Sequence, residues 1–316
     1  MAARVCVLAG GVGAARFLEG VVQVVPPDQV TAIVNTGDDL EFHGLYVAPD
    51  LDIVMYTLAG LVDAAKGWGL EGDTFDCLEM LGRYGEATWF GLGDRDLATC
   101  LLRTRMLAEG QPLSVATDRL RRALGVSVAL LPMSDHPVRT EIETPEAVLP
   151  FQEYFVKRRQ QDEVRAVHFR GAEVARPAPG VLEALREADA IVIAPSNPYV
   201  SIGTILAVPG IHAALVQARD RVVAVTPIIG GAAVKGPAAA MLASLGSEVS
   251  AFGVASLYRD IASAFVLDEI DAELAPRIDM VGLRAIVAPT LMRGPIEKRA
   301  LAACALRAVG TAFAAI

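Results

Sequence analysis

Glycine residues near the start of the chain give the first indication of chemistry. Gly10, Gly11 and Gly13 directly follow a short apolar stretch and precede a segment of helical periodicity. Glycines between a strand and a helix let the backbone approach a phosphate, which the free N–H groups and positive dipole end of the helix attract. The segment therefore indicates a phosphate-binding loop, although the glycines alone fit a mononucleotide, a dinucleotide or a tight turn.

The glycine spacing departs from that of enzymes that bind NAD. Arg16 stands where the third glycine of the GxGxxG pattern is expected. Asn35 ends the second predicted strand, where an acid that binds the ribose of NAD is expected. Both departures argue against a nicotinamide oxidoreductase, and we expect no NAD(P) binding.

Acidic residues follow the second predicted strand and open the next predicted helix. Asp38 and Asp39 lie in the first of these segments, and Asp50 and Asp52 lie in the second. Carboxylates beside a phosphate loop suit Mg²⁺, which prefers a few carboxylates together with phosphate oxygens. Capping of a turn or helix is the alternative, and for Asp50 we expect it as an N-cap. We expect Asp38 and Asp52 to hold Mg²⁺, with Asp39 as second choice.

Further loops at predicted strand ends and helix starts carry polar side chains. Arg95 lies between two acids, a pattern that fits either an anion clamp or a surface ion-pair cluster. Lys235 either neutralises a phosphate or faces solvent, and His136 is expected to face solvent. With the residues above, the predicted substrate-binding set is Gly10, Gly11, Gly13, Asn35, Asp52, Arg95, Ser134, Asp135, Ser196, Asn197, Ser201, Gly203 and Lys235.

The elements that position these loops alternate between apolar strands and helices. Strands are predicted at 4–9, 30–34, 126–131, 138–143, 164–169, 190–194 and 222–225, with a final helix after Pro295. Helical periodicity dominates 51–65, 74–84, 96–108 and 113–124. The pattern predicts an α/β fold with a mostly parallel sheet and an inserted helical part at about 55–125, within one domain over 1–316. Parallel strands bring the loops that follow them to one edge of the sheet.

Composition and charge exclude several classes of function. The 316 residues are 53% hydrophobic and carry a net charge of −9 without a long Lys/Arg run, which argues against a nucleic-acid surface. The best candidate for a membrane span, 301–316, is short and reads as a final packed helix. The N-terminus lacks a signal-peptide layout, so we expect a cytoplasmic protein. Cys6, Cys77, Cys100 and Cys304 show no metal-binding spacing and are expected to be buried free thiols.

Taken in order along the chain, these segments resemble the 2-phospho-L-lactate transferase family, called CofD in archaea and FbiA in actinobacteria. The resemblance spans most of the chain and rests on the segments 10–13, 35–39, 49–52, 93–96, 131–135, 195–203 and 227–236. It implies a Rossmann-like core with an inserted helical part, a homodimer and a requirement for Mg²⁺. It also implies a role in the biosynthesis of the deazaflavin coenzyme F420.

The resemblance also implies a reaction. Family members transfer a phospholactyl or phosphoenolpyruvyl group from a donor linked to GMP through a diphosphate bond. The acceptor is the 5′-hydroxyl of the deazaflavin alcohol Fo, and GMP is released. By this resemblance Asp52, Arg95, Ser134 and Asp135 would face Fo, while Ser196, Asn197, Lys235 and the glycine loop would bind the phosphates.

A second family resembles the same core. The gluconeogenesis-factor proteins, which bind nucleotide sugars as regulators, have a similar glycine loop and a similar segment at 35–39. The segments 93–96 and 131–135 fit the transferases better. The sequence leaves open whether the donor carries lactate, enolpyruvate or 3-phosphoglycerate, and it does not identify the residues that recognise guanine. It assigns no general base, although Asp52 is a candidate.

Overall fold

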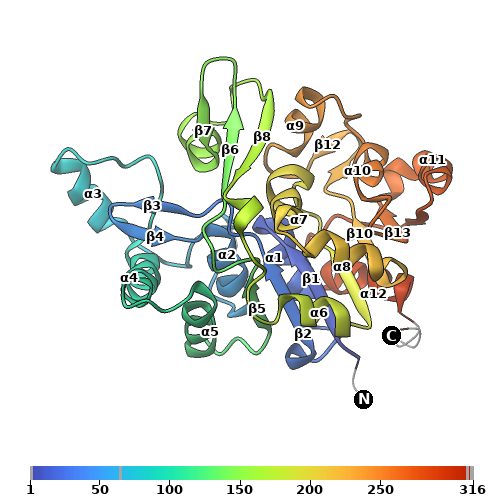
Figure 1. Ribbon diagram of the computed structural model, residues 1–316, viewed down its shortest axis with the longest axis horizontal. Helices are drawn as coiled ribbons and strands as arrows, with labels where there is room; N and C mark the ends of the chain where they lie inside the picture. The colour runs from blue at the N-terminus through green and yellow to red at the C-terminus, as the bar shows by residue number, and fades with distance from the viewer. Residues whose placement is uncertain (1–2, 64–65, 311–312, 314–316) are drawn as a thin grey trace.

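A computed structural model describes residues 3–63, 66–310 and 313, and a seven-stranded sheet forms its centre (Figure 1). All neighbouring strands of this sheet run parallel, in the order β14-β13-β10-β9-β1-β2-β5. The strands are β1 (Val5–Ala9), β2 (Val30–Val34), β5 (Ala129–Pro132), β9 (Ala190–Ile193), β10 (Val222–Val225), β13 (Ala264–Leu267) and β14 (Arg284–Val287). The predicted α/β class with a mostly parallel sheet is confirmed.

Helices cover both faces of the sheet, which explains why its central strands are apolar throughout. Val5 and Val7 of β1 enter one core cluster, whereas Cys6 and Leu8 enter the other. The first cluster includes α1 (Gly11–Val21), α2 (Pro49–Leu58), α5 (Leu113–Ala123) and α12 (Pro295–Val309). The second includes α6 (Val181–Glu187), α7 (Thr204–Ala207), α8 (Ile211–Gln217), α9 (Ala238–Ser244), α10 (Ala251–Tyr258) and α11 (Ala275–Met280).

The predicted helical segment lies between β2 and β5 along the chain. It continues from α2 into α3 (Asp76–Arg83), α4 (Asp94–Ala108) and α5, and Figure 1 shows α3 at one end of the molecule. The helix predicted at 51–65 ends earlier, because Gly60 adopts a φ of 68°. The N–H groups of Gly60 and Leu61 then bond back to Thr57 and Tyr56, which closes the helix. Residues 64 and 65 lie outside the described part of the chain.

Short antiparallel strands flank the main sheet. β3 (Leu40–Phe42) and β4 (Leu45–Val47) form a hairpin whose two turn residues, His43 and Gly44, both have positive φ. The strands predicted at 138–143 and 164–169 are confirmed as β6 (Arg139–Glu143) and β8 (Ala166–Arg170). They form a separate sheet with β7 (Val148–Pro150), above the main sheet in Figure 1, while β11 (Ile228–Ile229) and β12 (Ala232–Ala233) form a small hairpin.

The remaining predictions concern the cysteines and the membrane. The four cysteines are free, and Cys6 and Cys100 are buried as predicted, whereas Cys304 is only partly buried. Cys77 is exposed, because it lies in the first turn of α3, a helix without a buried residue. Within residues 3–63 and 66–310, no single helix has the length and apolar character to cross a membrane. Two consecutive helical segments together have this length and apolar character, but the chain bends by 93° between them; they are Pro198–Ala207 and Ile211–Gln217.

Candidate active site

The strand order places a ligand site beside the glycine loop. The order reverses between β1 and β9, since the chain runs from β1 toward one edge of the sheet and from β9 toward the other. In open α/β sheets, ligands bind at such a switch point, outside the carboxyl ends of the strands. The loops after β1 and β9 meet there: Ser196 Oγ donates to the Gly10 carbonyl at 2.8 Å and lies 3.3 Å from the Gly10 nitrogen.

Close packing explains two of the glycines. A Cβ on Gly10 would lie 2.6 Å from the Cβ of Ser201 and 3.0 Å from Asp50 Oδ2. A Cβ on Gly13 would lie 2.3 Å from the carbonyl oxygen of Pro195. Side chains at these positions would push the start of α1 away from the loop after β9, so the glycines hold the two loops together.

Asp50 belongs to this site, contrary to the prediction that it caps a helix. Ala48 is the N-cap of α2, which begins at Pro49, and Asp50 lies inside the first turn. Its carboxylate accepts from Asn35 Nδ2 at 2.9 Å and from the backbone N–H of Gly11. Burial raises the pKa of Asp50 to about 6.

Asp38 and Asp39 are buried, with exposed fractions of 5% and 3%. Tyr46 donates to Asp39 Oδ2 at 2.7 Å, but the Oδ1 atoms of both aspartates have no hydrogen-bond partner. Burial, followed by the negative charge of Asp50, raises the pKa of Asp38 well above its usual range. Burial also raises the pKa of Asp39 to about 8, although Arg139 opposes the shift. One oxygen of each carboxyl is therefore buried without a hydrogen bond.

These acids fit a hard divalent cation. Asp38, Asp39 and Asp50 offer carboxylate oxygens, and two of those oxygens are buried and unpaired. A cation there would satisfy the orphaned oxygens and relieve the repulsion that raises the pKa of Asp38. The donor set consists of oxygen atoms alone, as Mg²⁺ prefers.

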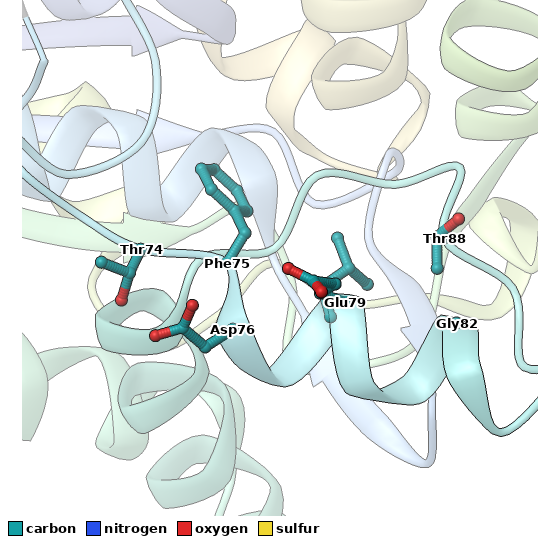
Figure 2. Close-up of a pocket in the computed structure, with 7 residues that line it drawn as sticks. Thr74, Phe75, Asp76, Glu79, Gly82 and Thr88 are labelled. Carbon is teal, nitrogen blue, oxygen red and sulfur yellow. The ribbon is translucent and has the colours of Figure 1, made fainter.

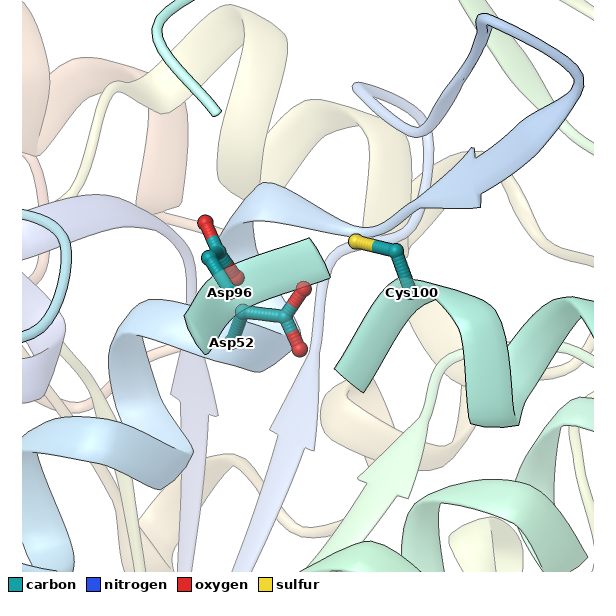
Figure 3. A group of neighbouring side chains, drawn as sticks. All are labelled: Asp52, Asp96 and Cys100. Carbon is teal, nitrogen blue, oxygen red and sulfur yellow. The ribbon is translucent and has the colours of Figure 1, made fainter. Parts of the chain in front are cut away.

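Asp52, which was predicted to hold Mg²⁺, is paired with an arginine instead. It forms a buried ion pair with Arg103, which donates to both carboxylate oxygens, to Oδ2 at 3.0 Å. Asp52, Asp96 and Cys100 lie close together, with one ligand atom from each within 4.8 Å of the others (Figure 3). A thiol is a poor ligand for Mg²⁺, and Arg103 already neutralises Asp52. The ligand atoms of Asp38, Asp39 and Asp50 do not gather this closely, but the unpaired oxygen of Asp38 and its repulsion with the other two acids make Asp38 the better candidate for a magnesium ligand.

A polar network joins α2 and α4 beside this ion pair. The hydroxyl of Tyr56 donates to Asp96 Oδ1 at 2.7 Å and lies 2.7 Å from Thr99 Oγ1. Burial and the charge of Asp52 raise the pKa of Asp96 to about 7. Nothing in the sequence pattern marked Arg103 or Tyr56, since both lie on apolar helical faces.

Three predicted residues, Arg95, Ser134 and Asp135, form bonds within the protein. Arg95 is exposed in the first turn of α4, which begins two residues earlier than predicted, and its Nη1 donates to the Glu71 carbonyl at 3.0 Å. Ser134 Oγ donates to the Arg176 carbonyl at 2.7 Å. Asp135 accepts from the backbone N–H and the hydroxyl of Ser114, at the start of α5. Their roles toward a substrate stay predictions.

Asn197 and Gly203 stand at the two ends of a π-helical turn, Pro198–Gly203, that follows β9. The side chain of Asn197 accepts from the N–H groups of Tyr199 and Val200 and so caps this turn. Gly203 lines a cavity of about 330 Å³ together with Phe169 and Tyr199. Ser201 instead packs against Gly10, so Ser201 contacts the glycine loop while Gly203 lines the cavity.

A second pocket, with a volume of about 580 Å³, lies along α3 (Figure 2). It is lined by Thr74, Phe75, Asp76, Leu78, Glu79, Gly82 and Thr88. Thr74 Oγ1 donates to Asp94 at 2.5 Å, so the pocket adjoins the segment that contains Arg95. It lies in the helical segment and contains none of the buried acids.

Comparison with known proteins identifies the family. The model of the family "2-phospho-L-lactate transferase CofD" matches residues 5–281. The chain belongs to the CofD family. It is 47% identical to a phosphoenolpyruvate transferase of Streptomyces griseus over 96% of this chain and 97% of the relative. It is 38% identical to a 2-phospho-L-lactate transferase of Methanosarcina mazei over 96% of this chain and 99% of the relative.

A solved structure supports the fold independently. A UPF0052 family protein of Bacillus halodurans superposes with a TM-score of 0.62 at 18% identity, covering 96% of this chain and 99% of that one. This likeness concerns the fold alone. The CofD match places the chain among transferases, as the resemblance implied, rather than with the gluconeogenesis-factor regulators or the nicotinamide oxidoreductases.

Proposed function

We propose that this CofD-family enzyme transfers a phosphoenolpyruvyl or phospholactyl group to the 5′-hydroxyl of Fo in the biosynthesis of coenzyme F420. The donor carries this group on GMP through a diphosphate bond, and GMP is the leaving group. The observation that carries the proposal is the set of buried aspartates at the switch point of the sheet: Asp50 contacts the glycine loop, and its charge acts on Asp38, which has an unpaired oxygen.

Sequence identity favours enolpyruvate as the transferred acid. Relatives named phosphoenolpyruvate transferase from three Streptomyces species are 45–47% identical to this chain. Relatives named 2-phospho-L-lactate transferase from two Methanosarcina species are 38% and 40% identical. We therefore infer that the enolpyruvyl donor is preferred to the lactyl donor.

The protein would act by alignment and by neutralisation of charge, as phosphoryl transfer requires. Backbone N–H groups at the start of α1 bind the diphosphate, and Ser196 holds Gly10 in place for this contact. Asn35 orients Asp50, and Tyr46 orients Asp39, so that both carboxylates are held in fixed positions at the site.

Asp38 would hold Mg²⁺, with the charges of Asp50 and Asp39 beside it. When bound, the ion neutralises negative charge on the phosphate oxygens. Arg103 engages both oxygens of Asp52, which makes Asp52 a positioning residue between α2 and α4 rather than a general base. We also expect a homodimer, as the resemblance implies.

Binding of the deazaflavin tests this proposal against the regulator alternative. Fo is fluorescent, and its emission can be followed while the protein is added in the presence of Mg²⁺. The proposal predicts saturable, micromolar binding of Fo. A protein that binds a nucleotide sugar such as UDP-glucose but leaves the emission of Fo unchanged would be a regulator instead.

A further inference from the structure

Lys235 reaches the start of α1 from the loop that follows β12. Its ammonium donates to the carbonyl of Lys66 at 3.4 Å. A Cβ built on Gly67 would lie 3.5 Å from this ammonium and 3.9 Å from a methyl group of Val12. Val12 belongs to the glycine loop, so the positive charge of Lys235 lies beside the proposed diphosphate site.

Arg16 projects toward the same place from one turn further along α1. Residues four apart lie on one face of a helix, and Arg16 therefore shares the face of Val12. Long helical side chains lean toward the N-terminus of their helix, which directs this guanidinium back toward the glycine loop. The positive charge of Arg16 also lowers the pKa of Lys235, after burial, which is consistent with two neighbouring cations.

Neither cation has an acidic partner within the described part of the chain. The ion pairs found there involve other basic residues. Lys66 offers a contrast, since it pairs with Asp63 at 3.3 Å and lies over the rings of Trp68 and Phe75. Two neighbouring cations without an acid repel each other, and a bound anion would turn this repulsion into attraction.

We propose that Arg16 and Lys235 form a two-cation clamp for the diphosphate of the donor. The inference rests on the proposed function and gives Arg16, which replaces the third glycine of a dinucleotide loop, a role in binding. The planar guanidinium suits two oxygens of one phosphate, whereas the ammonium acts as a point charge. The glycine loop then lies between Asp50, which approaches Gly10 and Gly11, and a basic pair near Val12.

Calorimetric titration with inorganic pyrophosphate and with GDP, both in the presence of Mg²⁺, tests the clamp. Arg16→Gln and Lys235→Gln should each weaken the binding of both probes at least about tenfold, or about 1.4 kcal/mol. Arg16→Lys should weaken it less, because it keeps the charge but loses the planar fork. Arg119→Gln is the matched control, since Arg119 is an exposed arginine within α5. It should bind both probes as the wild type does.

Thermal melts of all variants verify that each is folded. Unchanged affinity for pyrophosphate in either glutamine variant would overturn the clamp, as would a wild-type protein that fails to bind pyrophosphate at millimolar concentration. The clamp and the proposed function fail separately. If the wild-type protein binds pyrophosphate through Arg16 and Lys235 but does not bind Fo, the proposed function alone is contradicted. If Arg16→Gln transfers the group normally with an unchanged KM for the donor, the clamp alone is contradicted.

Discussion

At the scale of single residues, the roles of some buried acids could be predicted from the sequence and the role of another could not. Asp38 and Asp39 were identifiable because they follow a strand of the sheet, where ligands of α/β folds bind. Asp50 was assigned to capping, since an acid at a helix start has that common role. Only the packing of Asn35 and Gly11 around its carboxylate reveals the contact with the site.

Asp38→Asn removes one carboxylate of the proposed magnesium site. It should lower kcat about a hundredfold or more, since the loss of one preorganised electrostatic group costs about that much. Mg²⁺ should raise the melting temperature of the wild-type protein and should have a much smaller effect on this variant. A rate and a Mg²⁺-dependent melting shift equal to those of the wild type would remove Asp38 from the site.

The raised pKa of Asp39 predicts a pH dependence of stability in the absence of Mg²⁺. Between about pH 4 and pH 8 the unfolded chain has released this proton, while the folded protein retains it. The wild type should therefore lose stability relative to Asp39→Asn as the pH rises through this window. Urea denaturation with EDTA at pH 5 and pH 8 measures the difference, and a constant difference between the two proteins would contradict the burial argument.

At the scale of elements, the ion pair of Asp52 with Arg103 connects α2 to α4. Helical periodicity predicted both helices, but it does not show which residues meet across them, because that depends on how the inserted helices pack. The end of α2 was readable from the sequence, because Gly60 is a glycine stop signal. The strands β3 and β4 were not, because three residues each are too few to show a period.

Arg103→Met should destabilise the protein by about 3–5 kcal/mol, because it leaves Asp52 buried without its partner. The double variant Asp52→Leu/Arg103→Met should recover much of this loss, since an apolar pair replaces the ions. The control is Arg105→Met on the same helix, which removes an exposed pair with Glu109 and should cost less than about 1 kcal/mol. Equal midpoints of urea unfolding for Arg103→Met and Arg105→Met would show that the buried pair contributes little.

At the scale of the whole molecule, the order of the strands brings distant segments to one site. Alternating apolar strands and helices predicted a parallel sheet, and with it one shared edge for the loops. The strand order itself was not predictable from periodicity, because it depends on which strands pair. The position of β1 beside β9 is what joins the glycine loop to Ser196 and Ser201.

The same strand order occurs in enzymes that bind dinucleotides, yet we predict that this chain does not use NAD(P). Arg16 and Asn35 replace the third glycine and the acid that recognises ribose, and Asn35 is engaged with Asp50. Calorimetric titration with NAD⁺ and NADPH should show no binding below the millimolar range, with GDP as the positive control. A micromolar complex with either nicotinamide cofactor would contradict this interpretation of the loop.

The proposed transfer reaction is tested most directly by mass detection of its product. Wild-type protein is incubated with Fo, Mg²⁺ and, in parallel, the GMP-diphosphate-linked enolpyruvyl and lactyl donors, with a parallel reaction in EDTA. The account predicts Fo extended by the phosphorylated acid, one equivalent of GMP, faster turnover with the enolpyruvyl donor and no product in EDTA. Intact Fo and donor after incubation of a folded protein with Mg²⁺ would contradict it.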